Sequence, residues 1–129
     1  MNFRGYQGLA VWNRAVDLVA YTYRITETLR GQAAPELLSG MRRMSLSIPS
    51  QLAAGYQTSS CHDYLRYVHA AQIDLARMES QVTTLTMLGW ATDDDVADLQ
   101  GLMTHLDHLL TCLERYLAGH DAEVALQPK

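Results

Sequence analysis

The sequence has little of what marks secreted, membrane-spanning or strand-rich proteins. Among 129 residues there are two cysteines and three prolines, and no stretch alternates β-branched and polar residues as a strand does. The first five residues lack the apolar core of a secretory signal, so we expect a reduced, cytoplasmic protein. The longest apolar runs, such as residues 9–12, are far shorter than the roughly 20 residues of a membrane-spanning helix, so we expect no membrane partner.

Patterns that support catalysis are also missing. No Glu is followed three residues later by His, as carboxylate-bridged metal bundles require, and no glycine-rich phosphate loop precedes a lysine. Cys61, His62 and Asp63 supply a nucleophile, a base and an acid, but consecutive residues on a helix point about 100° apart and cannot form a relay. We therefore expect no enzymatic activity and no cofactor.

His105, His108 and Cys112 are the strongest candidates for metal ligands. Their spacing of i, i+3 and i+7 places them on one flank of a helix, and imidazole and thiolate are common zinc ligands. The flank lies away from the expected core stripe, and a tetrahedral site usually takes a further ligand from elsewhere. A solvated face with a half-covered cysteine is the interpretation we prefer, so no metal site is assigned.

Composition and turn residues predict an all-α fold with four helices. The apolar share is 48%, and turn-forming residues at 31–35, 57–60 and 89–93 separate four helical stretches. The expected helices cover about residues 8–30, 36–56, 60–88 and 93–118. They form one domain of residues 1–118, which is followed by a flexible tail of residues 119–129. Because the links are short, we predict an antiparallel, up-down-up-down, left-handed four-helix bundle.

Three helix ends carry recognisable capping residues. Ser60 followed by Asp63 is typical of a helix start in which the serine side chain accepts a backbone N–H. Gly89 is typical of a left-handed residue just past a helix end. The acids at residues 93–95 favour the positive end of a helix dipole, and we interpret them as part of a helix start rather than a metal loop.

Apolar residues recur with helical periodicity and predict which face of each helix is buried. In the first helix the main stripe is Trp12, Val16, Val19 and Tyr23, and a second apolar flank includes Leu18. Together the stripe and the flank cover a wider arc of the helix surface than a helix needs to face the core of its own bundle. Leu18 is therefore expected to contact another subunit, and packing of this helix between two helices of the same chain is the alternative. The other expected core stripes are Met41, Met44, Ile48 and Leu52; Tyr64, Val68, Ala71, Leu75, Met78 and Val82; and Val96, Leu99, Met103, Leu106, Leu110, Leu113 and Leu117.

Arg42, Arg43 and Leu46 form an unusual outward-facing set. Leu46 lies between two arginines on the face of its helix opposite the expected core, so a partner could use this face. The arginines would contact phosphates or pair with acids of a neighbouring helix or subunit, and we favour ion pairing because acids are in excess. Residues 1–50 carry six arginines and three acids, whereas residues 51–129 carry four bases and eleven acids, which fits head-to-tail contact between copies.

Four segments of the sequence resemble a known family. They are residues 9–15 (LAVWNRA), 42–55 (RRMSLSIPSQLAAG), 64–67 (YLRY) and 88–89 (LG). Together they resemble the bacterial four-helix bundle proteins encoded within 23S rRNA intervening sequences. The resemblance implies a left-handed up-down-up-down bundle that assembles into a ring-like homopentamer without assigned enzymatic activity. Relatives include the accessory proteins of diversity-generating retroelements, which are basic and engage nucleic acid and a reverse transcriptase.

Two functions follow from these observations. The leading hypothesis is a non-enzymatic scaffold or adaptor that self-associates through helix faces, in which Leu18, Arg42, Arg43 and Leu46 are the interaction residues. The alternative is a nucleic-acid-binding accessory protein that uses a local arginine patch. In that case Arg42 and Arg43 would act with nearby Arg14 or Arg24.

Overall fold

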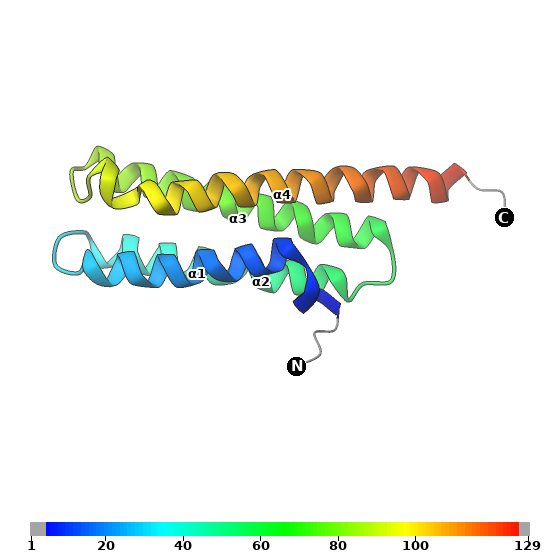
Figure 1. The fold of residues 1–129 in the computed structure, drawn as a ribbon, viewed down its shortest axis with the longest axis horizontal. Coiled ribbons are helices and arrows are strands. Elements are labelled where there is room, and N and C mark those ends of the chain that lie inside the picture. The colour runs from blue at the N-terminus through cyan, green and yellow to red at the C-terminus, as the bar shows by residue number, and fades with distance from the viewer. Residues whose placement is uncertain (1–4, 127–129) are drawn as a thin grey trace.

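The backbone folds into four long helices preceded by one short turn of 3-10 helix. The computed structural model describes the backbone of residues 5–126 and the side chains of residues 5–7 and 9–120. The elements, shown in Figure 1, are η1 (Gly5–Gly8), α1 (Ala10–Thr28), α2 (Pro35–Tyr56), α3 (Cys61–Met87) and α4 (Asp93–Leu126). The predicted all-α fold is confirmed.

The predicted capping residues Ser60 and Gly89 are found at the start and at the end of α3. At the start of α3, the Ser60 hydroxyl accepts the backbone N–H of Asp63 at 3.1 Å. At the end of α3, Gly89 has a φ of +74°, and the N–H of Trp90 donates to the carbonyl of Leu85 at 2.9 Å. A left-handed residue followed by this long backbone bond closes a helix end, and glycine adopts the required φ without strain.

The start of α4 is at Asp93 as predicted, with the acids of residues 93–95 in its first turn, whereas its end differs from the prediction. Its start is a reciprocal capping box: the Thr92 hydroxyl accepts the N–H of Asp95 at 3.1 Å, and the Asp95 carboxylate accepts the N–H of Thr92 at 2.9 Å. Its end is at Leu126, so a helix end at residue 118 is wrong. Residues 119–126, expected in a flexible tail, continue the helix, and residues 127–129 lie outside the described residues.

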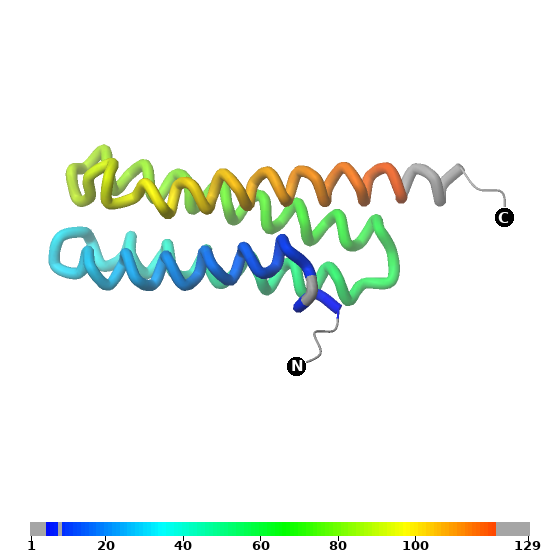
Figure 2. The backbone as a smooth tube through the Cα atoms, in the orientation of Figure 1, coloured from blue at the N-terminus to red at the C-terminus, as the bar shows by residue number. Residues whose placement is uncertain are grey.

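The helices run alternately in opposite directions, which the tube in Figure 2 shows most directly. Each helix packs against two neighbours, since contacts join α1 to α2, α2 to α3, α3 to α4 and α4 to α1. This is the up-down-up-down arrangement expected from short links; the left-handed twist stays a prediction. Within residues 5–126, no helix is long and apolar enough to cross a membrane.

The core lies along the bundle axis and confirms most of the predicted stripes for the last three helices. Tyr64, Met44 and Leu113, at the edges of those stripes, are only partly buried. One buried carboxylate was not predicted: Asp74, 6% exposed, accepts the hydroxyl of Ser47 at 2.5 Å across the α2–α3 contact. The core side chains that α2, α3 and α4 bury most deeply are Met41, Ile48, Leu52, Val68, Leu75, Met78, Val82, Leu85, Leu99, Leu106 and Leu110.

For α1, the predicted core stripe and the predicted surplus stripe are largely interchanged, although Trp12 of the predicted core stripe does pack, partly buried, against the core. Leu18 is 0% exposed and belongs to the core of its own chain, so its assignment to a subunit contact is wrong. Val16 is 39% exposed, although it was expected inside. The reason is that Thr22 and Thr26, which look polar, are buried beside Leu18: each hydroxyl donates to a carbonyl one turn earlier at 2.7 Å. Their polarity is satisfied within the helix, and their small size suits the core.

Candidate protein-interaction site

An apolar groove runs between α1 and α2 on the surface of the bundle. Its volume is about 370 Å³. Val16 and Leu46, which face each other across it from the two helices, are 39% and 47% exposed. We call this feature the α1–α2 groove, and it is lined by Tyr6, Trp12, Val16, Val19, Leu46, Pro49, Ser50 and Ala53.

The groove exists because α1 carries apolar residues on two faces. One face fills the core, and the other, which includes Trp12, Val16 and Val19, lies beside the outer face of α2. At one end, η1 contacts both helices and places the Tyr6 ring 5.3 Å from the Trp12 ring, centroid to centroid. These large side chains are therefore held in place, as a preformed contact surface requires.

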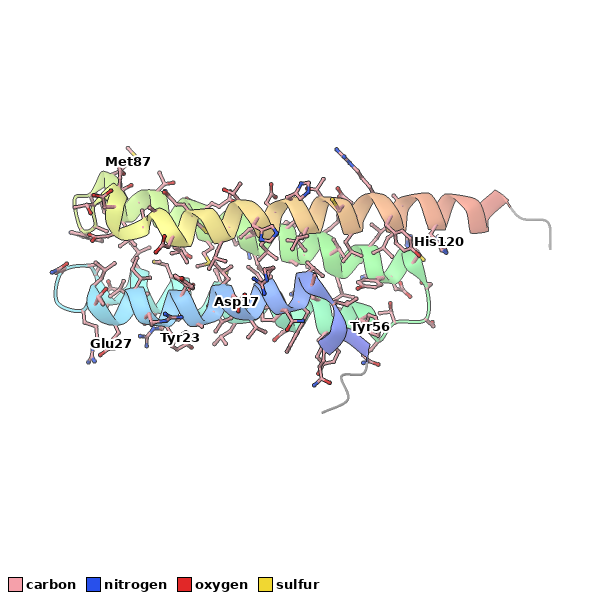
Figure 3. The ribbon with its side chains drawn as sticks, in the orientation of Figure 1. Asp17, Tyr23, Glu27, Tyr56, Met87 and His120 are labelled. Atoms are coloured by element: carbon pink, nitrogen blue, oxygen red, sulfur yellow. The ribbon has the colours of Figure 1, made fainter. Side chains whose placement is uncertain are left out.

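Arg42 fixes α2 to α1 close to the groove. Its Nε donates to the Thr26 hydroxyl at 2.6 Å, its guanidinium lies 4.5 Å from the centre of the Tyr23 ring, and Nη2 lies 3.6 Å from a carboxylate oxygen of Glu27. Figure 3 shows Tyr23 and Glu27 on the same side of α1. Ion pairing of Arg42 with a neighbouring helix, the interpretation favoured from the sequence, is confirmed. A residue held by these contacts is tied into the fold rather than extended toward solvent.

The other arginines of the proposed nucleic-acid patch have different surroundings from Arg42. Arg14 pairs with Asp17 of its own helix at 3.0 Å. Arg24 stacks on Tyr21 with its Cζ 4.7 Å from the ring centre, in a hollow between α1 and α4 rather than between α1 and α2. Arg43 is exposed, and no ion pair of it is found among the described residues. Arg24 and Arg42 of the proposed nucleic-acid patch thus lie between different pairs of helices, whereas Arg43 is free to contact a partner.

The metal-ligand candidates on α4 are exposed, and only two of them meet. The Cys112 Sγ lies 3.7 Å from the His108 Nε2, whereas no such contact involves His105. Within the described part of the chain, no three His, Cys, Asp or Glu side chains are grouped closely enough to hold a metal ion. The three predicted candidates thus do not form a three-ligand site.

Two side chains have shifted pKa values, and neither belongs to the groove. Burial, and to a smaller degree the nearby Tyr56, raises the pKa of Tyr64 above its ordinary value. Burial, and to a smaller degree the charge of Asp107, raises the pKa of Glu79. Partial loss of solvent is the larger cause in both cases, and neither side chain lines the α1–α2 groove.

Sequence reasoning found one wall of the groove and missed the other. The periodicity of α2 identified an outward face with Leu46 that a partner could use, and Leu46 does line the groove. The α1 wall was assigned to the core because Trp12 and Val16 form its most apolar stripe. Tyr6 gave no signal, because the short helix η1 is too brief to show periodicity.

The fold and the groove define a class of small helical-bundle proteins with an apolar surface between two helices. The chain belongs to the 23S rRNA-intervening sequence protein family, because the family model matches residues 7–112. A comparison with curated proteins finds no match. The family match includes most of the groove and stops before the last part of α4.

Proposed function

We propose that this protein is a non-enzymatic scaffold or adaptor that self-associates through the α1–α2 groove. The observation that supports this proposal is the exposure of Val16 and Leu46 within a groove whose other walls include Trp12, Val19 and Pro49. Contiguous apolar surface on a small protein is costly in water and is typical of a contact site. A reducing, cytoplasmic environment is part of the proposal and fits the two free cysteines.

The charge distribution supports a second copy of the same chain as the partner. All groove residues except Ala53 lie within residues 1–50, in which six arginines outnumber three acids. Residues 51–129, the second half, carry eleven acids and four bases. Contact between the groove of one copy and a surface from the second half of another would bring opposite charges together. Such head-to-tail contacts close into rings when the rotation permits, which agrees with the homopentamer that the family resemblance implies.

Sedimentation velocity tests self-association directly. We expect a species several times heavier than the 14.4 kDa monomer, with a population that increases with concentration. A protein that stays monomeric at the highest attainable concentration would contradict the proposal. The homopentamer is the specific expectation, and light scattering on the same sample gives the subunit number.

Retention on immobilised RNA and single-stranded DNA separates the scaffold from the nucleic-acid-binding alternative. We expect no retention at moderate ionic strength. Arg42 and Arg14 pair with acids of their own chain, and Arg24 lies between α1 and α4, on another side of α1 from Arg42. Retention that weakens steeply with added salt would instead indicate release of counterions from phosphates. In that case the accessory-protein function would replace the scaffold.

A further inference from the structure

His108 and Cys112 form a pair of donor atoms on the outer face of α4. They lie one helical turn apart, which brings side chains at i and i+4 together on a helix surface. The Nε2 of His108 and the Sγ of Cys112 are 3.7 Å apart, and both residues are exposed. An ion can therefore reach both atoms from solvent without any movement of the helices.

The separation of the two donor atoms matches the spacing in a zinc site. Zinc binds sulfur at about 2.3 Å and nitrogen at about 2.0–2.1 Å, so two such ligands at a tetrahedral angle lie about 3.5–3.6 Å apart. The observed 3.7 Å differs little from this value. Because both residues are on one continuous helix, the backbone holds their Cβ atoms one turn apart and only side-chain rotamers have to be fixed, which lowers the entropic cost of binding.

We propose that His108 and Cys112 bind a divalent transition metal of the zinc class as a two-point chelate. The thiol of Cys112 loses its proton to solvent as the sulfur–metal bond forms, and His108 binds through the lone pair of Nε2 with its proton on Nδ1. Imidazole and thiolate together favour zinc and its neighbours over calcium or magnesium. The other coordination positions face solvent and are taken by water.

Cobalt titration of the full-length, phosphine-reduced protein tests the chelate. Co²⁺ substitutes for Zn²⁺, and its bond to a thiolate produces a charge-transfer absorption in the near ultraviolet. We expect this band to rise with added Co²⁺ and to disappear when Zn²⁺ is added. The variants His108→Ala and Cys112→Ser should each weaken Co²⁺ binding at least tenfold, and the Cys112 variant should lose the band entirely.

Two variants serve as matched controls. Cys61→Ser removes the other cysteine, which is on α3, and His105→Ala removes a histidine from the same helix as the pair. Both should keep the band and the affinity. Circular dichroism should show unchanged helix content in all four variants, because His105, His108 and Cys112 are exposed and Cys61, at the edge of the core, is replaced by a serine of similar size. Absence of the band in the unsubstituted protein would overturn the proposal. So would a band that survives Cys112→Ser or is lost in His105→Ala.

Discussion

Replacing Leu46 with aspartate is expected to convert the assembly into monomers. Leu46 is 47% exposed in the single chain and lies in the α1–α2 groove, so a carboxylate there is harmless in the monomer and unfavourable in a covered contact. Burying an unpaired charge in an apolar interface weakens association by on the order of 100-fold or more. Sedimentation velocity at a concentration where the unsubstituted protein is assembled measures the change.

Ile73→Asp is the matched control for that experiment. Ile73 is an aliphatic residue of α3 with 54% exposure, so the substitution has the same chemistry on a surface outside the groove. We expect Ile73→Asp to leave the assembly intact and both variants to keep the helix content of the parent. An assembled Leu46→Asp protein would show that the groove is not the specific contact surface. Dissociation by Ile73→Asp as well would place Ile73 in the surface of residues 51–129 that contacts the groove of another copy.

The second large effect is expected on the stability of the fold, when Leu18 is substituted. Truncation to alanine should lower the free energy of unfolding by about 3 kcal/mol, because a fully buried leucine is replaced and a cavity is left in the core. The paired variant Val16→Ala should change the free energy of unfolding by less than about 0.5 kcal/mol. Val16 is 39% exposed, and the better helix propensity of alanine offsets the small loss of burial.

Urea denaturation followed by circular dichroism measures both values. The Leu46→Asp background is the suitable one, because association would otherwise add to the apparent stability of every variant. The periodicity of α1 alone predicts the opposite order, with Val16 in the core and Leu18 at a subunit contact. If Val16→Ala proved the more damaging change, the orientation of α1 described above would be wrong.

Most of the fold follows from the sequence because three of the helices are simply patterned. In α4 the expected seam, which includes Val96, Leu106 and Leu117, is buried almost throughout, since leucines at alternating three- and four-residue spacing leave only one possible inward face. Ser60 and Gly89 also end α3 as expected, because each satisfies backbone groups through local geometry that needs no distant partner.

The orientation of α1 and the groove could not be predicted in the same way. A hydrophobicity pattern counts Thr22 and Thr26 as polar, whereas their hydroxyls bond to carbonyls of their own helix and their methyl groups pack inside. Which of two apolar faces turns inward depends on what α2 and α4 present to α1, and that information is distributed over distant residues. The contact of Tyr6 with Trp12 depends likewise on the packing of η1 against both α1 and α2.

The contacts of Arg42 show which interactions can be predicted from the charges in the sequence and which cannot. The sequence indicated an ion pair with a neighbouring helix, and Glu27 provides it. The sequence could not show that Thr26 and Tyr23 complete the contact, because these residues are sixteen and nineteen positions away and meet Arg42 only through the α1–α2 packing. Arg42, which the sequence indicated as an interaction residue, thus joins two helices of its own chain.

The unequal placement of the two chain ends has a practical consequence for labelling. Tyr6 lines the groove, so any tag joined upstream of it would emerge beside the proposed contact surface. By contrast, α4 continues past the neighbouring helices in Figure 1, up to Leu126, the last residue that the structure describes. Fluorophores and affinity handles therefore belong on the C-terminal side, and an N-terminal fusion that abolished assembly would report obstruction by the fusion partner rather than a property of the protein.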